Sequence, residues 1–313
     1  MKKLLLAVAA LTPLFAHAAV GDQVIANSSN TVSVQTWATH AGAVVGLFFK
    51  DAQGNVFNFV NNSDHGRDIQ MAVTLDGYCE ALNPTEAGRA NDGSSPSTTS
   101  AIGSMSLLAP NKLYSSVHPA YWLSPGQAVG TQSPGCTPAP GGIAVNSTAV
   151  SSDVMYKVIT VGIGANDLQK VVMYQSSLTS ANARTMATWQ VPALYLIPEF
   201  THFEKYTGTS WTDMAQGAAD PTTSYATEFV ANTIMVSNAA GTRAVGVWSP
   251  GSSMVGARYL SGITSDPTTT ITANKFLGPF AAGQTLNAVS YFVVGTRAEV
   301  QRIMTQSVIG QLY

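Results

Sequence analysis

Apolar and polar residues alternate along most of the chain with a period of two, which is typical of β-strands. The alternation is clear at residues 31–37 and 69–75, where Met71, Val73 and Leu75 share one side. Similar runs predict further strands at residues 42–50, 56–60, 153–163, 168–175, 184–197, 229–236, 243–248, 268–272 and 285–294. The chain is therefore expected to be mainly β.

Turn residues separate several of these strands. Segments 51–55 (DAQGN) and 164–167 (GAND) are rich in Gly, Asn and Asp, so each predicts a hairpin. Pro192 lacks the N–H that a strand ladder needs, which predicts a bulge or an edge strand at that point.

Only residues 297–309 show a helical period, with Thr296 placed to cap the first turn. The apolar positions of this helix are Val300, Ile303, Met304 and Ile309. Many strands, long loops at 91–104 and 124–147, and one late helix predict a large antiparallel β-sandwich. No linker divides it and no propeller repeat is present, so residues 19–313 are expected to form a single domain.

The first 18 residues read as a signal peptide. Lys2 and Lys3 precede an apolar stretch of about twelve residues, shorter than the roughly 20 that span a bilayer. Ala16 and Ala18 fit the small-residue rule for cleavage, so export to the periplasm or the cell exterior is expected. No later segment is long and apolar enough to predict a membrane span.

Charge is scarce, at 10% of residues, and the net charge is −2. No run of Lys or Arg is present, which argues against nucleic acid and anionic membranes as partners. Cys79 and Cys136 are the two cysteines, and export makes a disulfide between them the expected state. A reactive thiol and a metal site are the alternatives.

Eight of the 32 charged residues fall within residues 64–92. Ordered charges lose solvation unless they are paired or used, so this cluster needs a reason. Asp64, His65 and Arg67 precede a strand, where Arg offers a fork for a carboxylate and His an acid or base. The alternative is an Asp–Arg pair that fixes a turn.

A rigid turn at residues 83–88 (NPTEAG) follows in the same cluster. Glu80 and Glu86 are the best candidates for a catalytic carboxylate pair, and Asn83 for a substrate contact. The alternative is two solvated glutamates.

A third group, at residues 195–204 (YLIPEFTHFE), combines Glu199 and His202 with aromatic rings. Sugar rings stack their C–H faces on aromatic rings, so Tyr195, Trp189 and, in a separate loop, Tyr121 are candidate substrate contacts. Core aromatics with a satisfied His are the alternative. No metal-ligand spacing and no nucleotide or cofactor motif is present, so no metal or cofactor is expected.

The strings HGRDIQ, NPTEAG, PEF, GVWSP and the VGT before the helix resemble a group of uncharacterised secreted bacterial β proteins. Those proteins are similar in turn to the galactose-mutarotase-like supersandwich group, whose members include carbohydrate lyases, hydrolases and epimerases. The resemblance implies a supersandwich-like fold and a carbohydrate substrate. It carries over no catalytic residue.

The expected function is cleavage of glycosidic bonds in a poly- or oligosaccharide by an exported enzyme. Hydrolysis is favoured over β-elimination because few basic residues are available to meet an acidic polymer. A non-catalytic glycan-binding module and a structural exported protein are the alternatives.

Overall fold

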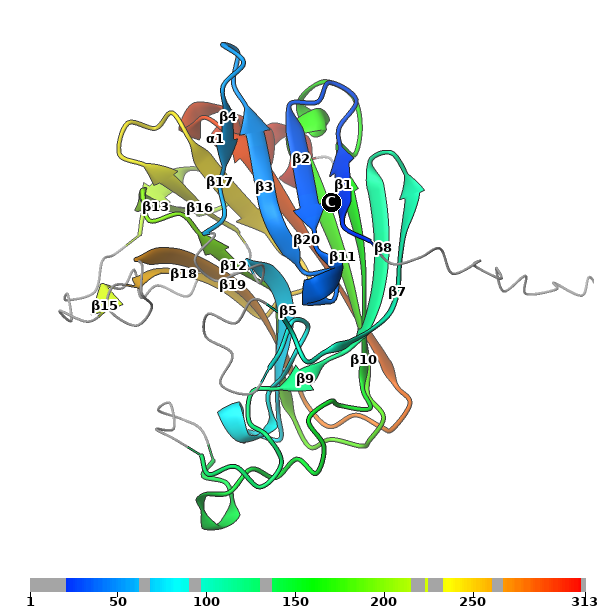
Figure 1. The fold of residues 1–313 in the computed structure, drawn as a ribbon. Helices are drawn as coiled ribbons and strands as arrows, with labels where there is room; N and C mark the ends of the chain where they lie inside the picture. The colour runs from blue at the N-terminus through cyan, green and yellow to red at the C-terminus, as the bar shows by residue number, and fades with distance from the viewer. Residues whose placement is uncertain are drawn as a thin grey trace, which may run out of the picture.

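The computed structural model describes residues 21–61, 68–89, 97–129, 137–214, 223–224, 233–260 and 267–310. Within these residues the chain is mainly β, with two sheets packed face to face and one α-helix (Figure 1). Every pair of named strands is antiparallel, so the predicted β-sandwich is confirmed.

The larger sheet has eleven strands among the described residues. Its main path runs β1 (Gln23–Ala26), β2 (Val32–Thr36), β3 (Val44–Lys50), β5 (Ile69–Leu75), β12 (Ala187–Leu196), β19 (Thr268–Leu277), β18 (Met254–Leu260) and β15 (Thr223–Ser224). Three short strands branch from this path: β4 (Val56–Asn58), β6 (Pro84–Thr85) and β9 (Ala120–Tyr121).

The smaller sheet has nine strands in the part of the chain that the structure describes. In order they are β14 (Trp211–Asp213), β13 (Phe200–Tyr206), β16 (Thr233–Asn238), β17 (Ala244–Trp248), β20 (Thr285–Gly295), β11 (Val171–Thr179), β10 (Val154–Val161), β8 (Lys112–His118) and β7 (Ala101–Ala109).

The core lies between the two sheets, because each sheet turns alternate residues inward. On β10, for example, Met155, Ile159 and Val161 are fully buried, while Tyr156 and Val158 are half-buried on the other side.

The helix α1 (Arg297–Ile303) covers part of the outer face of the smaller sheet and continues into a π-helical segment, Met304–Ile309. Thr296 caps its first turn, as the sequence predicts, and it forms a reciprocal capping box with Glu299. Val300, Ile303 and Met304 pack against Trp248 and neighbouring strand residues in a second apolar cluster. No helix of the described ranges is long and apolar enough to cross a membrane.

The predicted elements differ from the structure in several places. Residues 101–104, predicted as loop, begin β7, and the strands β8, β13 and β18 were not predicted. The hairpin at 164–167 is confirmed, but Leu168 lies in a 3-10 helix and β11 begins at Val171. Pro192 lies at a bulge, on a central strand. Residues 229–232 of a predicted strand lie outside the described residues.

Candidate functional site

The outer face of the larger sheet is polar at its centre, over β5, β12, β19 and β18. The core-facing residues of these strands are apolar, and alternation turns the residues between them outward. They are mostly amides, hydroxyls and small side chains, and we call them the polar face: Gln70, Ala72, Gln190, Ala193, Tyr195, Met254, Gly256, Arg258, Thr268, Thr270, Thr272 and Asn274.

Several of these polar side chains are recessed although they point away from the core. Gln70, Thr270 and Asn274 are only 6%, 4% and 8% exposed. The Gln70 side-chain oxygen accepts a hydrogen bond from Ala87 N at 3.2 Å, and Asn274 Nδ2 donates to Thr272 Oγ1 at 3.4 Å. Arg258, in contrast, is exposed at one side of the face.

The Tyr195 backbone is hydrogen-bonded to Asn61 and to Asp68. Its carbonyl accepts from Asn61 N at 3.0 Å, and its N–H donates to Asp68 O at 2.6 Å. The Asp68 side chain is fully buried at the start of β5, and strand alternation puts it on the same side as Gln70. Asn61 and Asp68 therefore both lie at the edge of the polar face.

Three predicted site residues, Asp64, His65 and Arg67, lie outside the described residues. Their roles stay predictions.

Glu86 fills a gap beside β5. In the larger sheet β3 pairs with β5 only at Ile69, and β6 pairs with it only at Ala72, so the ladder is open between them. Glu86 N donates to Met71 O at 2.8 Å, and its carboxylate accepts from Met71 N at 2.9 Å. The glutamate thus takes the place of a missing strand partner.

The Glu86 carboxylate also joins the two sheets through the core. It forms an ion pair with Lys157 of β10 and accepts a hydrogen bond from the Tyr174 hydroxyl at 3.2 Å. Both charged side chains have no exposed surface. Burial lowers the pKa of Lys157 well below its ordinary value and raises the pKa of Tyr174. The predicted catalytic Glu86 is therefore enclosed by protein groups.

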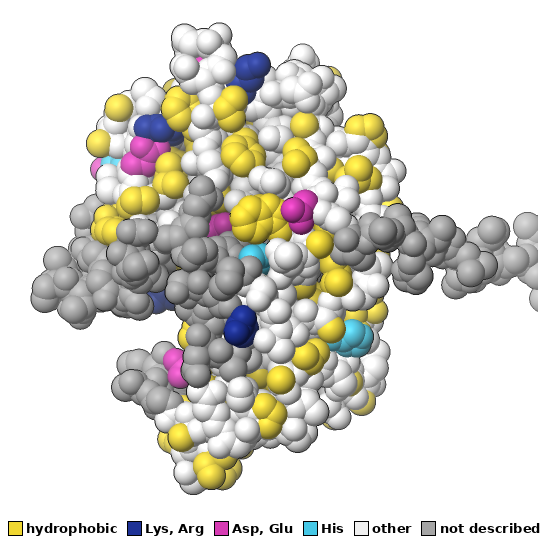
Figure 2. Space-filling view, viewed as in Figure 1, with side chains coloured by type: hydrophobic (Ala, Val, Ile, Leu, Met, Phe, Trp, Pro, Cys, Tyr) yellow, Lys and Arg dark blue, Asp and Glu magenta, His cyan; other side chains and the backbone are white. Residues whose placement is uncertain are grey.

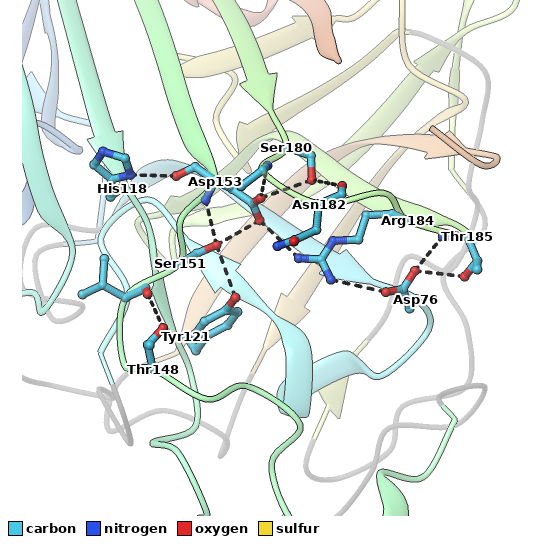
Figure 3. Close-up of polar contacts among 12 residues, drawn as sticks. Asp76, His118, Tyr121, Thr148, Ser151, Asp153, Ser180, Asn182, Arg184 and Thr185 are labelled. Carbon is cyan, nitrogen blue, oxygen red and sulfur yellow. Dashed lines mark hydrogen bonds and ion pairs between the residues drawn. The ribbon is translucent and has the colours of Figure 1, made fainter. Parts of the chain in front are cut away.

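A second buried network lies near β9 and the start of β10 (Figure 3). Asp153, which is 1% exposed, accepts hydrogen bonds from Ser151 Oγ at 2.9 Å, Ser180 Oγ at 3.1 Å and Ala181 N at 2.8 Å. The Tyr121 hydroxyl donates to Ser151 Oγ at 3.3 Å. Tyr121, a predicted substrate contact, is thus largely buried and bonded within the protein.

Arg184 links this network to the end of β5. One of its nitrogens lies 3.7 Å from Asp153 Oδ2 and another 3.4 Å from Asp76 Oδ2 (Figure 3). Burial opposes ionisation of Asp76, but hydrogen bonds from Thr185 and the charge of Arg184 hold the pKa of Asp76 below its usual value. The network fixes the turn that leads to Glu80.

Glu80, Asn83 and Tyr121 lie together at this end of the molecule. Glu80 is half-buried in the 3-10 helix Cys79–Leu82, which Asn83 ends. The Asn83 carbonyl accepts from Trp122 N at 3.4 Å, and Tyr121 pairs with Pro84.

The predicted disulfide partner Cys136 lies outside the described residues, so the Cys79–Cys136 bond stays a prediction. Its neighbour Thr137 donates from its N–H to Gly77 O at 2.9 Å, two residues before Cys79.

Glu199 and His202 lie near the opposite end of β12. Glu199 pairs with Arg243 at 2.6 Å, and the Arg243 guanidinium lies over the Phe57 ring at 4.6 Å. His202 Nε2, on β13, lies 3.2 Å from Asp213 Oδ1. These contacts lie at the edge of the smaller sheet, on and beside β13.

His202, Glu204 and Asp213 could in principle hold a metal ion, since their ligand atoms lie within 4.8 Å of one another. However, Arg297 donates to both oxygens of Glu204 at 2.7 and 2.8 Å. Bonding to Glu204 raises the pKa of Arg297, and its fixed positive charge opposes a cation. The group fits an ion-pair network better than a metal site.

The structure does not bring the Glu80 group together with Glu199. Leu75, five residues before Glu80, pairs with Ala187 at the first residue of β12, whereas Glu199 comes three residues after Leu196, its last residue. The ten residues of β12 separate the two groups by roughly 30 Å at about 3.3 Å per residue. Figure 1 shows the 3-10 helix of Glu80 in cyan in the lower half and β13 in the upper half.

Of the remaining predicted contacts, Trp189 is fully buried in the core and Tyr195 is half-buried on the polar face. The sequence did not single out Lys157, Asp153 or Arg184. A signal for Lys157 was present, because it occupies an inward position between Met155 and Ile159 in an alternating strand. Nothing in the sequence indicated its partner.

No protein-family model and no curated protein matches the sequence. Among solved structures, a GalM/aldose epimerase homologue from C. elegans has a TM-score of 0.47 at 9% identity, over 88% of this chain and 99% of that one. A galactose mutarotase related enzyme from Lactobacillus acidophilus gives 0.45 at 10% identity (88% and 98%). Heparan sulfate lyase HepC from Pedobacter heparinus, as a mutant, gives 0.41 at 11% identity (91% and 37%).

These are the kinds of protein that the sequence resemblance named. Similarity at this level does not assign the chain to their families, and no functional residue is transferred from them.

Proposed function

We propose that this protein binds a carbohydrate on the polar face of the larger sheet. The observation that carries the proposal is a set of outward-pointing amides and hydroxyls, of which Gln190 and Thr272 are half-buried, beside the half-buried ring of Tyr195. Recessed polar groups next to an aromatic ring suit a ligand that is itself rich in hydroxyls.

The charge of the molecule supports the same class of ligand. Charged side chains lie scattered over the face shown in Figure 2, and Arg258 is the one side chain among the polar-face residues named above that is charged at neutral pH. One exposed guanidinium can bind a single carboxylate or a sugar hydroxyl, but it is too little to hold a polyanion. A neutral or weakly acidic glycan is therefore the expected ligand.

Cleavage of a glycosidic bond is the second candidate, and Asp68 favours it. Its buried carboxylate lies at the edge of the polar face, next to Tyr195 in the hydrogen-bonded ladder. Hydrolysis needs a second carboxylate about 5 Å away, or roughly 6.5–9.5 Å away, depending on stereochemistry. Glu80, Glu86 and Glu199 do not meet that need at this face. β-Elimination would instead need a base such as Tyr195.

The export of the mature chain from residue 19 and its Cys79–Cys136 disulfide are part of the same proposal. An exported protein meets extracellular or cell-wall glycans, and an oxidising compartment allows the disulfide.

Calorimetric titration of the mature chain against soluble glycans tests the proposal. Tyr195→Ala is expected to weaken binding at least about tenfold, because it removes the aromatic contact. Tyr206→Ala is the matched control, since Tyr206 lies on β13 of the other sheet. Equal affinity in the Tyr195→Ala variant and the wild type would refute the site. Mass spectrometry of the incubated glycan detects cleavage, since hydrolysis adds water to the products and elimination does not.

A further inference from the structure

The outer face of the smaller sheet is covered by α1 at one end only. Farther along β8, β10 and β11 it carries a cavity of about 390 Å³. The cavity is lined by Tyr114, Tyr156, Lys157, Val158, Gln175, Ser177, Thr179 and Thr285. None of these residues belongs to the polar face of the larger sheet.

Two tyrosine rings lie next to each other in this cavity. Tyr114 of β8 pairs with Val158 of β10, and Tyr156 pairs with Ser116, so the tyrosines are diagonal neighbours across two strands. Both are half-buried. Burial, and then the neighbouring Tyr114, raise the pKa of Tyr156, so its ring is a neutral phenol at physiological pH.

The polar groups around the rings are held in place by cross-strand hydrogen bonds. Ser177 Oγ donates to Asn287 Oδ1 at 2.7 Å, and the hydroxyls of Thr179 and Thr285 lie 2.8 Å apart. Gln175 is exposed and offers both a donor and an acceptor. Fixed side chains of this kind lose little entropy when they bind a ligand.

The lining presents no ionised side chain. Lys157 lines the cavity through its main chain, because its side chain points into the core and has no exposed surface. An anionic ligand would lack a counter-charge here, and a lipid would leave the hydroxyls and the amide unpaired. A neutral ligand with apolar C–H faces and many hydroxyls needs no counter-charge, and its hydroxyls can pair with the hydroxyls and the amide of the lining.

We propose that this cavity is a second carbohydrate-binding site, for a neutral sugar chain stacked on Tyr114 and Tyr156. Its existence does not depend on the site proposed on the larger sheet. A protein with two such sites on opposite faces could hold a polymer at one face while the other engages a separate chain.

Titration of the Tyr195→Ala variant with maltohexaose, cellohexaose, mannohexaose and galactohexaose isolates this cavity. Binding of at least one of them is expected to persist, and to weaken at least about tenfold when Tyr114→Ala and Tyr156→Ala are added. The matched pair Tyr114→Phe and Tyr156→Phe keeps the rings and is expected to stay within about threefold.

Absence of binding to all four sugars in the Tyr195→Ala variant would overturn the proposal, as would equal affinity with and without the two tyrosines. Hydroxyl-radical footprinting oxidises neutral rings and gives a reading that does not depend on how the alanine variant folds. In the wild-type protein, the bound hexasaccharide is expected to protect Tyr114 and Tyr156 from oxidation. Unchanged oxidation of both would contradict stacking on these rings.

Discussion

At the scale of single residues, the buried ion pair between Glu86 and Lys157 is the contact whose loss is expected to destabilise the fold most. Removing one partner leaves a buried charge without compensation. Lys157→Met and Glu86→Gln are each expected to lower the free energy of unfolding by about 3–5 kcal/mol. Urea denaturation measures the change.

The double variant Lys157→Met with Glu86→Gln is the control for this pair. It removes both charges and keeps an acceptor for Met71 N, so it should be more stable than either single variant. A double variant less stable than both singles would contradict the account.

Asp76 makes a prediction about acid stability. Its pKa is lowered in the folded state, so as pH falls the unfolded chain takes up this proton first. The stability that the ionised Asp76 contributes is present above about pH 4 and is lost as pH falls through the folded pKa. Asp76→Asn is expected to cost about 1 kcal/mol at pH 7.

The same variant should make the free energy of unfolding less dependent on pH below about 4. Thermal unfolding followed from pH 7 to pH 2 tests this. Identical slopes for Asp76→Asn and the wild type would show that other carboxylates dominate.

Sequence reasoning could identify individual residues of the site but not their partners. Tyr195 was named as a ligand contact, and it does lie on the polar face. Glu86 was named as a catalytic acid because its turn is rigid and charged. Its partner Lys157 is 71 residues away, and no local pattern reveals which inward position faces which across two sheets.

At the scale of elements, the packing of α1 on the smaller sheet depends on Gly246. A Cβ built there would lie 2.0 Å from Met304 Sδ and 2.7 Å from Val300 Cγ1. Gly246→Ala is therefore expected to push α1 outward and to cost about 1–3 kcal/mol. Chemical denaturation measures the loss.

Gly278→Ala is the matched control for this substitution, because nothing lies within 4 Å of its Cβ position. It should change stability by no more than about 0.5 kcal/mol. Equal changes in stability for the two substitutions would mean that backbone entropy, and not a steric clash of the added Cβ with α1, causes the loss.

Local patterns predicted the elements well where the alternation was strong. The N-cap at Thr296 and the bulge at Pro192 follow from residue chemistry that acts within a few positions. The strands β7 (AIGSMSLLA) and β8 (KLYSSVH) were missed because Gly and Ser dilute their apolar alternation. β7 pairs with β8, and β8 pairs with β10. Hydrogen bonds to neighbouring strands therefore stabilise segments whose own strand patterns are weak.

At the scale of the whole molecule, the sequence predicted the fold class but not which distant segments lie next to each other in the fold. Period-two patterns show that a chain forms sheets, but register and strand order depend on pairings far apart in sequence. The sequence grouped Glu80 with Glu199 by chemistry. The order of strands instead places them at opposite ends of β12.

The predicted disulfide acts at this scale, since it would close a loop of more than 50 residues. Such a crosslink is expected to contribute roughly 4 kcal/mol in the chain-entropy model. Cys79→Ser, or reductant added to the wild type, should lower the unfolding midpoint by comparable amounts. Intact mass with and without alkylation shows whether free thiols are present, and two alkylated cysteines in the native protein would refute the bond.

The Lys157 amine has no contact with solvent while the two sheets remain together. Amine-reactive reagents can therefore modify it only in molecules whose sheets have separated. Peptide mapping after a timed pulse of such a reagent would report how often the interior opens under native conditions, with the surface lysines as an internal standard for reagent strength.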